Sequence, residues 1–201
     1  MDLKMDYSSK LLSDEKLDAL VVFVSEDSDL RRNGLSNLPR ALKKPLSSLM
    51  ELGVFSGKKG TKHHLVTGDA TWKQALLVGL GPVDKLDGEG LRRAAGKVGQ
   101  NLSGLKADTV GVLVTPLLKK SGKLSLGTVL AEGIQLGAYE FKQYKSPDDD
   151  SPKKLAKLRV CDPRKLTDSK SVKVGTVLAE ATNSARTLGN TPPNDLRPQQ
   201  V

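Results

Sequence analysis

The two histidines of this chain, His63 and His64, are the first residues whose type could do metal chemistry. Imidazole is a common zinc ligand, and zinc sites combine it with cysteine or carboxylate groups. Adjacent residues of a regular strand point to opposite faces of the sheet, so these two cannot face one ion together. We therefore predict two partly exposed strand histidines, and we assign no metal ligand in this chain.

The single cysteine, Cys161, is the one residue that could act as a thiol nucleophile. Such a role requires a nearby histidine and an electropositive setting that stabilises the thiolate. Neither is evident around Cys161, so a small buried core residue is the better interpretation. A lone cysteine also cannot form an internal disulfide, which favours residence in the cytoplasm.

Two further short motifs could bind ligands. Asp148, Asp149 and Asp150 could hold a hard cation, but flexible adjacent carboxylates rarely form a preorganised site, and a solvated loop is predicted. Gly79-Leu80-Gly81 follows an apolar run, as a dinucleotide-binding turn would. Its third glycine position holds Asp84, however, and Pro82 follows directly, so a tight strand-to-loop turn is predicted. No catalytic or cofactor-binding residue is assigned.

The formal net charge of +9 permits a role in nucleic-acid binding. The lysines are interspersed with acidic residues, and aromatic residues that could stack on bases make up only 3% of the chain. A lysine-rich surface is therefore favoured, with a nucleic-acid-binding module as the alternative. The first ten residues include four charged side chains, which excludes an apolar signal sequence there, and no run approaches the length of a membrane span.

Short apolar segments alternate with helical patterns along the chain. Strands are predicted where Leu3, Met5 and Tyr7 alternate with charged residues, and at 19–24, 62–67, 75–80, 110–114 and 157–161. Helices are predicted at 39–52, 91–102, 126–141 and 174–188, with Ser171 as the N-cap of the last. Glycines within the third helix should mark close packing on a neighbour. Loops are predicted at 56–60, 82–90 and 146–152.

The last predicted helix has one apolar face, formed by Val174, Val177, Leu178, Ala181, Ala185 and Leu188. Alternating strands and helices of this kind predict a three-layer α/β fold with helices on both sides of the sheet. Strand order cannot be read from the pattern.

A rigid segment follows this helix. Pro192 and Pro193 fix φ and remove two backbone donors, so neither a helix nor a central strand continues through them. Such a segment normally connects one folded unit to another. We therefore expect an α/β domain at 1–189 and a connector at 190–201 that leads toward a further domain.

The connector also carries a family resemblance. Ala185-Arg186-x-Leu188-x-Asn190-x-Pro192-Pro193-Asn194-x-Leu196-x-Pro198 resembles the junction segment of the leucyl aminopeptidase family, the hexameric two-metal exopeptidases also called cytosol aminopeptidases. Three earlier segments agree with the family in order and spacing. They are Leu76-Leu77-Val78-Gly79-Leu80-Gly81, Leu91-Arg92-Arg93-Ala94-Ala95-Gly96, and Glu132-Gly133-Ile134-Gln135-Leu136-Gly137-Ala138-Tyr139-Glu140-Phe141 with Tyr144-Lys145-Ser146.

The resemblance covers only the amino-terminal, non-catalytic half of the family. It implies a mixed sheet similar to macrodomains, and a domain that supports hexamer assembly and substrate access in an enzyme removing amino-terminal residues from peptides. The two divalent ions (zinc or manganese) and the catalytic lysine and arginine belong to the other half. No segment here matches the metal-binding motif Asn-Thr-Asp-Ala-Glu-Gly-Arg. Two alternatives remain: a nucleic-acid-binding module, and a macrodomain-like pocket for a nucleotide ligand.

Overall fold

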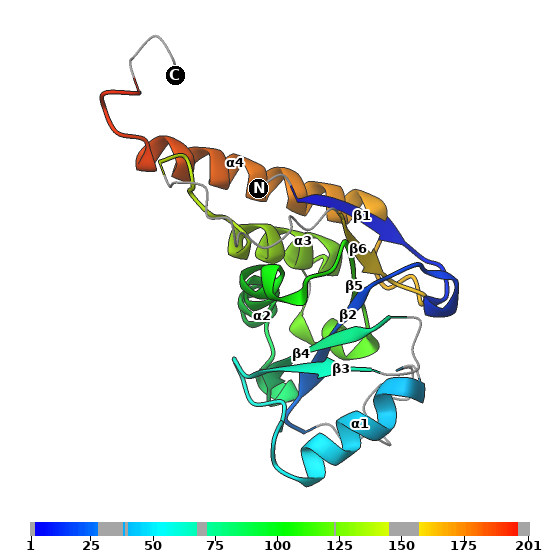
Figure 1. The fold of residues 1–201 in the computed structure, drawn as a ribbon. Coiled ribbons are helices and arrows are strands. Elements are labelled where there is room, and N and C mark those ends of the chain that lie inside the picture. Colours follow the sequence, from blue (N-terminus) through cyan, green and yellow to red (C-terminus); the bar gives the residue numbers. More distant parts are fainter. Residues whose placement is uncertain are drawn as a thin grey trace.

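The computed structural model describes residues 3–27, 38, 40–67, 72–122, 124–144 and 157–196 (Figure 1). The predicted loop at 146–152, with Asp148, Asp149 and Asp150, lies outside these residues. Within them, six strands form one sheet in the order β1-β6-β5-β2-β4-β3, in which only β3 runs antiparallel to its neighbour. The strands are β1 (Lys4–Ser8), β2 (Ala19–Ser25), β3 (Lys62–Val66), β4 (Gln74–Gly81), β5 (Thr109–Leu113) and β6 (Lys157–Cys161).

Helices cover both faces of this sheet. They are α1 (Arg40–Glu51), α2 (Gly88–Asn101), α3 (Leu126–Gly137) and α4 (Ser169–Asn190). Helices α2, α3 and α4 lie on one face, with α3 between the other two, and α1 lies on the opposite face (Figure 1). The predicted three-layer α/β fold with a mixed sheet is confirmed. Among the described residues, no helix is long and apolar enough to cross a bilayer.

The continuous apolar run of β2 supplies both layers of the core. Val21 and Phe23 pack on the α2–α3 side, whereas Val22 and Val24 pack on the α1 side, and all seven residues of the strand are buried. Successive side chains of a strand point to opposite faces, so a strand buried on both sides must be apolar throughout. This is why the run at 19–24 could be recognised as a central strand.

Three predicted boundaries were wrong, each because a cap or a turn decides where a helix begins or ends. Helix α2 begins at Gly88, inside the predicted loop 82–90, because Asp87 Oδ1 accepts the Gly90 amide at 2.6 Å. Helix α4 is capped by Asp168, whose Oδ1 accepts the Ser171 amide at 2.7 Å, and not by Ser171 itself. Helix α3 ends at Gly137, four residues before the predicted end.

The glycines of α2 and α3 bring the two backbones together, which confirms the close packing predicted for the glycines of the third helix. A Cβ added to Gly99 would lie 2.1 Å from the backbone oxygen of Ile134, and one added to Gly137 would lie 2.1 Å from that of Gly96. Helix α4 approaches α3 in the same way, because a Cβ on Gly175 would lie 2.3 Å from the Thr128 oxygen. The three helices therefore form one tightly packed layer.

Candidate functional site

The side chains of the adjacent His63 and His64 do not face a common site. Both lie on β3, where the half-buried His63 ring packs against Phe55 at 6.4 Å between centroids. The exposed His64 instead places Nε2 2.8 Å from Oε1 of Gln74. Among the described residues, no three His, Cys, Asp or Glu side chains gather closely enough to hold a metal ion.

Cys161 lies at the end of β6 and is fully buried. Burial, together with the nearby carboxylate of Glu15, raises the pKa of its thiol to about 12. A thiol in this state is almost wholly protonated at neutral pH, so it cannot serve as a nucleophile.

We expect the Cys161 thiol to resist reaction with a disulfide reagent such as 5,5′-dithiobis(2-nitrobenzoate) at pH 8. The native chain should react at least about a hundredfold more slowly than the chain in 6 M guanidinium chloride, because the raised pKa and the burial both act against attack. Absorbance at 412 nm measures the rate. Equal rates in the two conditions would contradict the buried position of Cys161.

The Gly79-Leu80-Gly81 segment ends β4 and does not offer its amides to a ligand. The amide of Gly79 donates to the Thr61 oxygen and that of Gly81 to the Gly57 oxygen, both at 2.9 Å. Gly81 has a φ of +81°, which turns the chain toward Pro82. The predicted tight turn at the end of the strand is therefore found, packed against the loop at 57–61.

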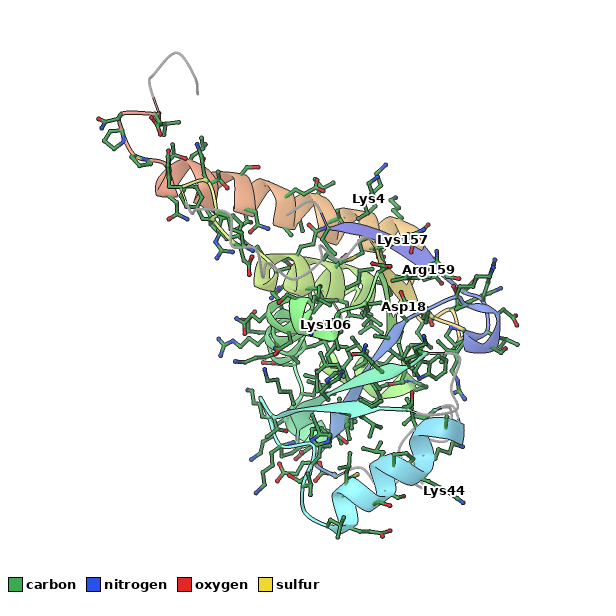
Figure 2. All side chains as sticks on the ribbon, in the orientation of Figure 1. Lys4, Asp18, Lys44, Lys106, Lys157 and Arg159 are labelled. Atoms are coloured by element: carbon green, nitrogen blue, oxygen red, sulfur yellow. The ribbon has the colours of Figure 1, made fainter. Side chains whose placement is uncertain are left out.

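Some of the labelled basic residues lie near one another, and others lie far apart (Figure 2). Lys4 and Lys157 lie near the outer edge of the sheet at β1 and β6, whereas Lys44 lies on α1 at the other end. Lys157 is also ion-paired with Asp6 at 2.8 Å. These residues give no specific support to a nucleic-acid-binding face.

A small pocket of about 270 Å³ lies where α3 and α4 begin, lined in part by Lys119, Thr167 and Asp168. A nucleotide pocket in this fold would need free backbone donors. The Gly127 amide already donates to Thr167 Oγ1 at 2.9 Å, and the Asp168 carboxylate would repel a phosphate. The pocket gives no support to a nucleotide ligand.

The most unusual surface in the described part of the chain is the outer face of α4. Its apolar residues point to solvent: Val174, Val177, Leu178 and Leu188 are between 41% and 53% exposed, and Ala181 and Ala185 beside them are also exposed. The residues that pack inward are Val172, Gly175 and Ala179. We call the six exposed residues the outer stripe. An apolar stripe of this length normally faces a core, so its exposure here is unusual for the surface of a folded domain.

A groove of about 900 Å³ runs beside the outer stripe, between α4 and the edge strand β1. Met5 of β1 and the preceding Leu3 line one wall, and Leu188 belongs both to the groove and to the outer stripe. The stripe and the groove therefore form one continuous surface along α4. The sequence identified the stripe as a helix face, but its outward direction was missed. The small inner residues Gly175 and Ala179 were the available signal, because they permit close approach to α3.

Comparisons with known proteins agree on one family. Residues 21–148 match the model described as the cytosol aminopeptidase family, N-terminal domain. The probable cytosol aminopeptidase of Rhodococcus jostii is 38% identical over 130 residues, which cover 62% of this chain and 24% of the relative. That of Persephonella marina is 29% identical over 203 residues, covering 100% of this chain and 40% of the relative. The matched regions thus span from about a quarter to two fifths of the length of these curated relatives.

A solved structure shares the fold. A tomato leucine aminopeptidase mutant superposes with a TM-score of 0.70 at 19% identity, over 98% of this chain and 40% of that protein. The order of strands and helices described above is thus the fold found in part of that protein.

Proposed function

The chain belongs to the cytosol aminopeptidase family, as an amino-terminal domain, and from this premise we propose that it is the non-catalytic part of a metal-dependent exopeptidase. The complete enzyme would remove amino-terminal residues from peptides in the cytoplasm. The outer stripe of α4 carries the proposal, because it supplies a surface suited to the remaining part of such a protein. Support also comes from relatives that are at least about two and a half times as long as the matched region.

In this proposal, residues 1–189 form the domain and 190–201 begin the connector to the catalytic part. The outer stripe packs against the catalytic domain, and the assembled protein is a hexamer in which this domain limits substrate access. The described residues offer no cluster of metal-ligating side chains, so they do not fit a metal centre. We accordingly place the two divalent ions, zinc or manganese, in the catalytic domain.

A chimera tests this proposal. This chain replaces the matching amino-terminal part of the Persephonella marina relative, and hydrolysis of leucine p-nitroanilide is measured with added Mn²⁺ or Zn²⁺. The 201-residue chain alone is expected to show no turnover, and the chimera is expected to be active. Metal-dependent turnover that copurifies with the chain alone would contradict a non-catalytic role.

Substitutions in the same chimera test where the catalytic domain docks. Val177→Asp with Leu178→Asp should lower activity about tenfold or more, because each unpaired carboxylate buried in an interface costs several kcal/mol. The matched control is Leu52→Asp with Val54→Asp, which changes two exposed apolar residues beyond the α2–α4 layer and should leave activity unchanged. Equal effects of the two pairs would contradict docking on α4.

A further inference from the structure

The two halves of α4 are held to the domain in different ways. In the first half, Val172, Gly175 and Ala179 are buried against α3 and the backbones nearly touch. From residue 180 to residue 190, every side chain is exposed or half-buried. Apolar packing therefore fixes only the beginning of the helix, and something else must fix the direction of its end.

Polar side chains of the second half bind the last turn of α3. Asn183 Nδ2 donates to the Gln135 oxygen at 3.2 Å, and Arg186 donates to the Leu136 oxygen at 3.1 Å. These two oxygens are among the last four carbonyls of α3, which have no partner within their own helix. The positive charge of Arg186 is also favourable at a helix carboxyl end.

Tyr139, two residues beyond α3, binds three residues of α4. The Arg186 guanidinium lies 4.1 Å from the centroid of the Tyr139 ring. The Thr187 hydroxyl donates to the Asn183 oxygen, so Tyr139 Oη donates to Thr187 Oγ1, at 3.1 Å. Asn190 Nδ2 in turn donates to Tyr139 Oη at 3.2 Å. We call Tyr139, Arg186, Thr187 and Asn190 the tyrosine clamp.

A second tyrosine binds the chain just beyond α4. The Tyr144 hydroxyl donates to Asp195 Oδ2 at 2.5 Å. The amides of Asp195 and Leu196 both donate to the Pro192 oxygen at 3.0 Å, so residues 192–196 form a turn. The segment 138–144 thus contacts both the end of α4 and the first residues of the proposed connector.

We propose that Tyr139 is a positioning residue that sets the angle of the second half of α4, and with it the direction in which the chain leaves the domain. Exposed hydrogen bonds are individually weak, so this half is the less stable unit and depends on the clamp to stay on α3. All residues of the clamp belong to this chain, so the clamp does not depend on a catalytic domain. Its role in presenting the outer stripe to a catalytic domain rests on the proposed function.

Hydrogen exchange on the 201-residue chain tests the clamp. Tyr139→Phe keeps the ring under Arg186 but removes both hydrogen bonds of Oη. Amides of residues 184–190 should then exchange about tenfold faster, the effect of losing one to two net hydrogen bonds. Tyr139→Ala, which also removes the ring, should speed exchange of these amides by a larger factor. The amides of residues 172–179 and the thermal midpoint of Tyr139→Phe should not change.

Tyr144→Phe is the matched control, since it removes a tyrosine hydroxyl that contacts Asp195 and not α4. It should speed exchange of the Asp195 and Leu196 amides and leave residues 184–190 unchanged. Unaltered exchange at 184–190 in Tyr139→Phe would overturn the proposal. So would equal acceleration over the whole of α4, because that pattern marks general destabilisation.

The chimera separates this inference from the proposed function. If the α4 aspartate pair has no effect on the chimera but Tyr139→Phe still loosens residues 184–190, the clamp stands and the docking proposal fails. If the pair inactivates the chimera but Tyr139→Phe leaves exchange unchanged, docking stands and the clamp is wrong.

Discussion

Gly99→Ala should lower the free energy of unfolding by about 3 kcal/mol. The added methyl carbon would lie 2.1 Å from the backbone oxygen of Ile134 and 2.6 Å from the amide nitrogen of Ala138. Backbone atoms cannot rotate away as a side chain can, so α2 and the last turn of α3 must separate. Urea unfolding followed by circular dichroism at 222 nm measures the loss.

Gly96→Ala, one turn earlier on α2, is the matched control. Its methyl carbon would meet nothing closer than the Gly133 oxygen at 3.6 Å, an ordinary contact. Alanine also favours a helix over glycine by up to about 1 kcal/mol, so this variant should be neutral or slightly more stable. Similar losses in both variants would mean that the helices do not approach as closely as described.

Arg159→Leu should cost about 3–5 kcal/mol of stability, the range for breaking a buried ion pair. Arg159 donates to both oxygens of Asp6, at 3.0 and 3.1 Å, and to Oε2 of Glu15 at 2.5 Å. Glu15 is only 2% exposed, so the substitution would leave its charge in the interior without the guanidinium that pairs with it. Arg93→Leu is the control, because its pair with Glu89 is exposed to solvent and should contribute little to stability. A loss no larger than the control's would contradict this assignment.

The same network gives stability a dependence on pH. Burial opposes ionisation of Glu15, but the Ser8 hydroxyl and the Arg159 guanidinium outweigh it and hold the pKa below the ordinary value of 4.5. A carboxyl whose pKa is lower in the folded state stabilises the protein above its unfolded pKa. That stability is lost as pH falls through the folded value. The wild-type chain should therefore lose stability below about pH 4.5, and Arg159→Leu should lose less over the same interval.

The sequence predicted every strand and helix described here, because each is defined locally. The run at 19–24 is apolar throughout, and the pattern of α2 repeats every three to four residues. Strand order was not predictable, because neighbours such as β1 and β6 are about 150 residues apart in the sequence. The residues of either segment do not indicate which strand it pairs with. The predicted start of a helix was wrong where a single carboxylate, such as that of Asp168, caps its first turn.

The candidate site was predictable only in part. His63, His64 and Cys161 lie where their sequence contexts indicated, since neither segment carries a metal-binding or catalytic motif beside them in the sequence. The outward direction of the outer stripe was missed because periodicity identifies a face of a helix but not the surface that the face meets. Here the inner side of α4 uses Gly175 and Ala179 for close approach to α3, so the larger apolar side chains, such as Leu178, remain outside.

The outer stripe also bears on how a longer polypeptide of this family would be made. An amino-terminal domain leaves the ribosome first and can fold while the rest is still being synthesised, at about 5–20 residues per second. During that interval the nascent protein would display uncovered apolar residues on α4 and would be a target for chaperones or for neighbouring nascent chains. The small side chains of Ala181 and Ala185 in the stripe reduce this exposed apolar area, and in the proposed docking they would leave a smooth surface for the contact. On the proposed docking, the composition of this helix is a compromise between a small exposed apolar area before assembly and apolar contact after it.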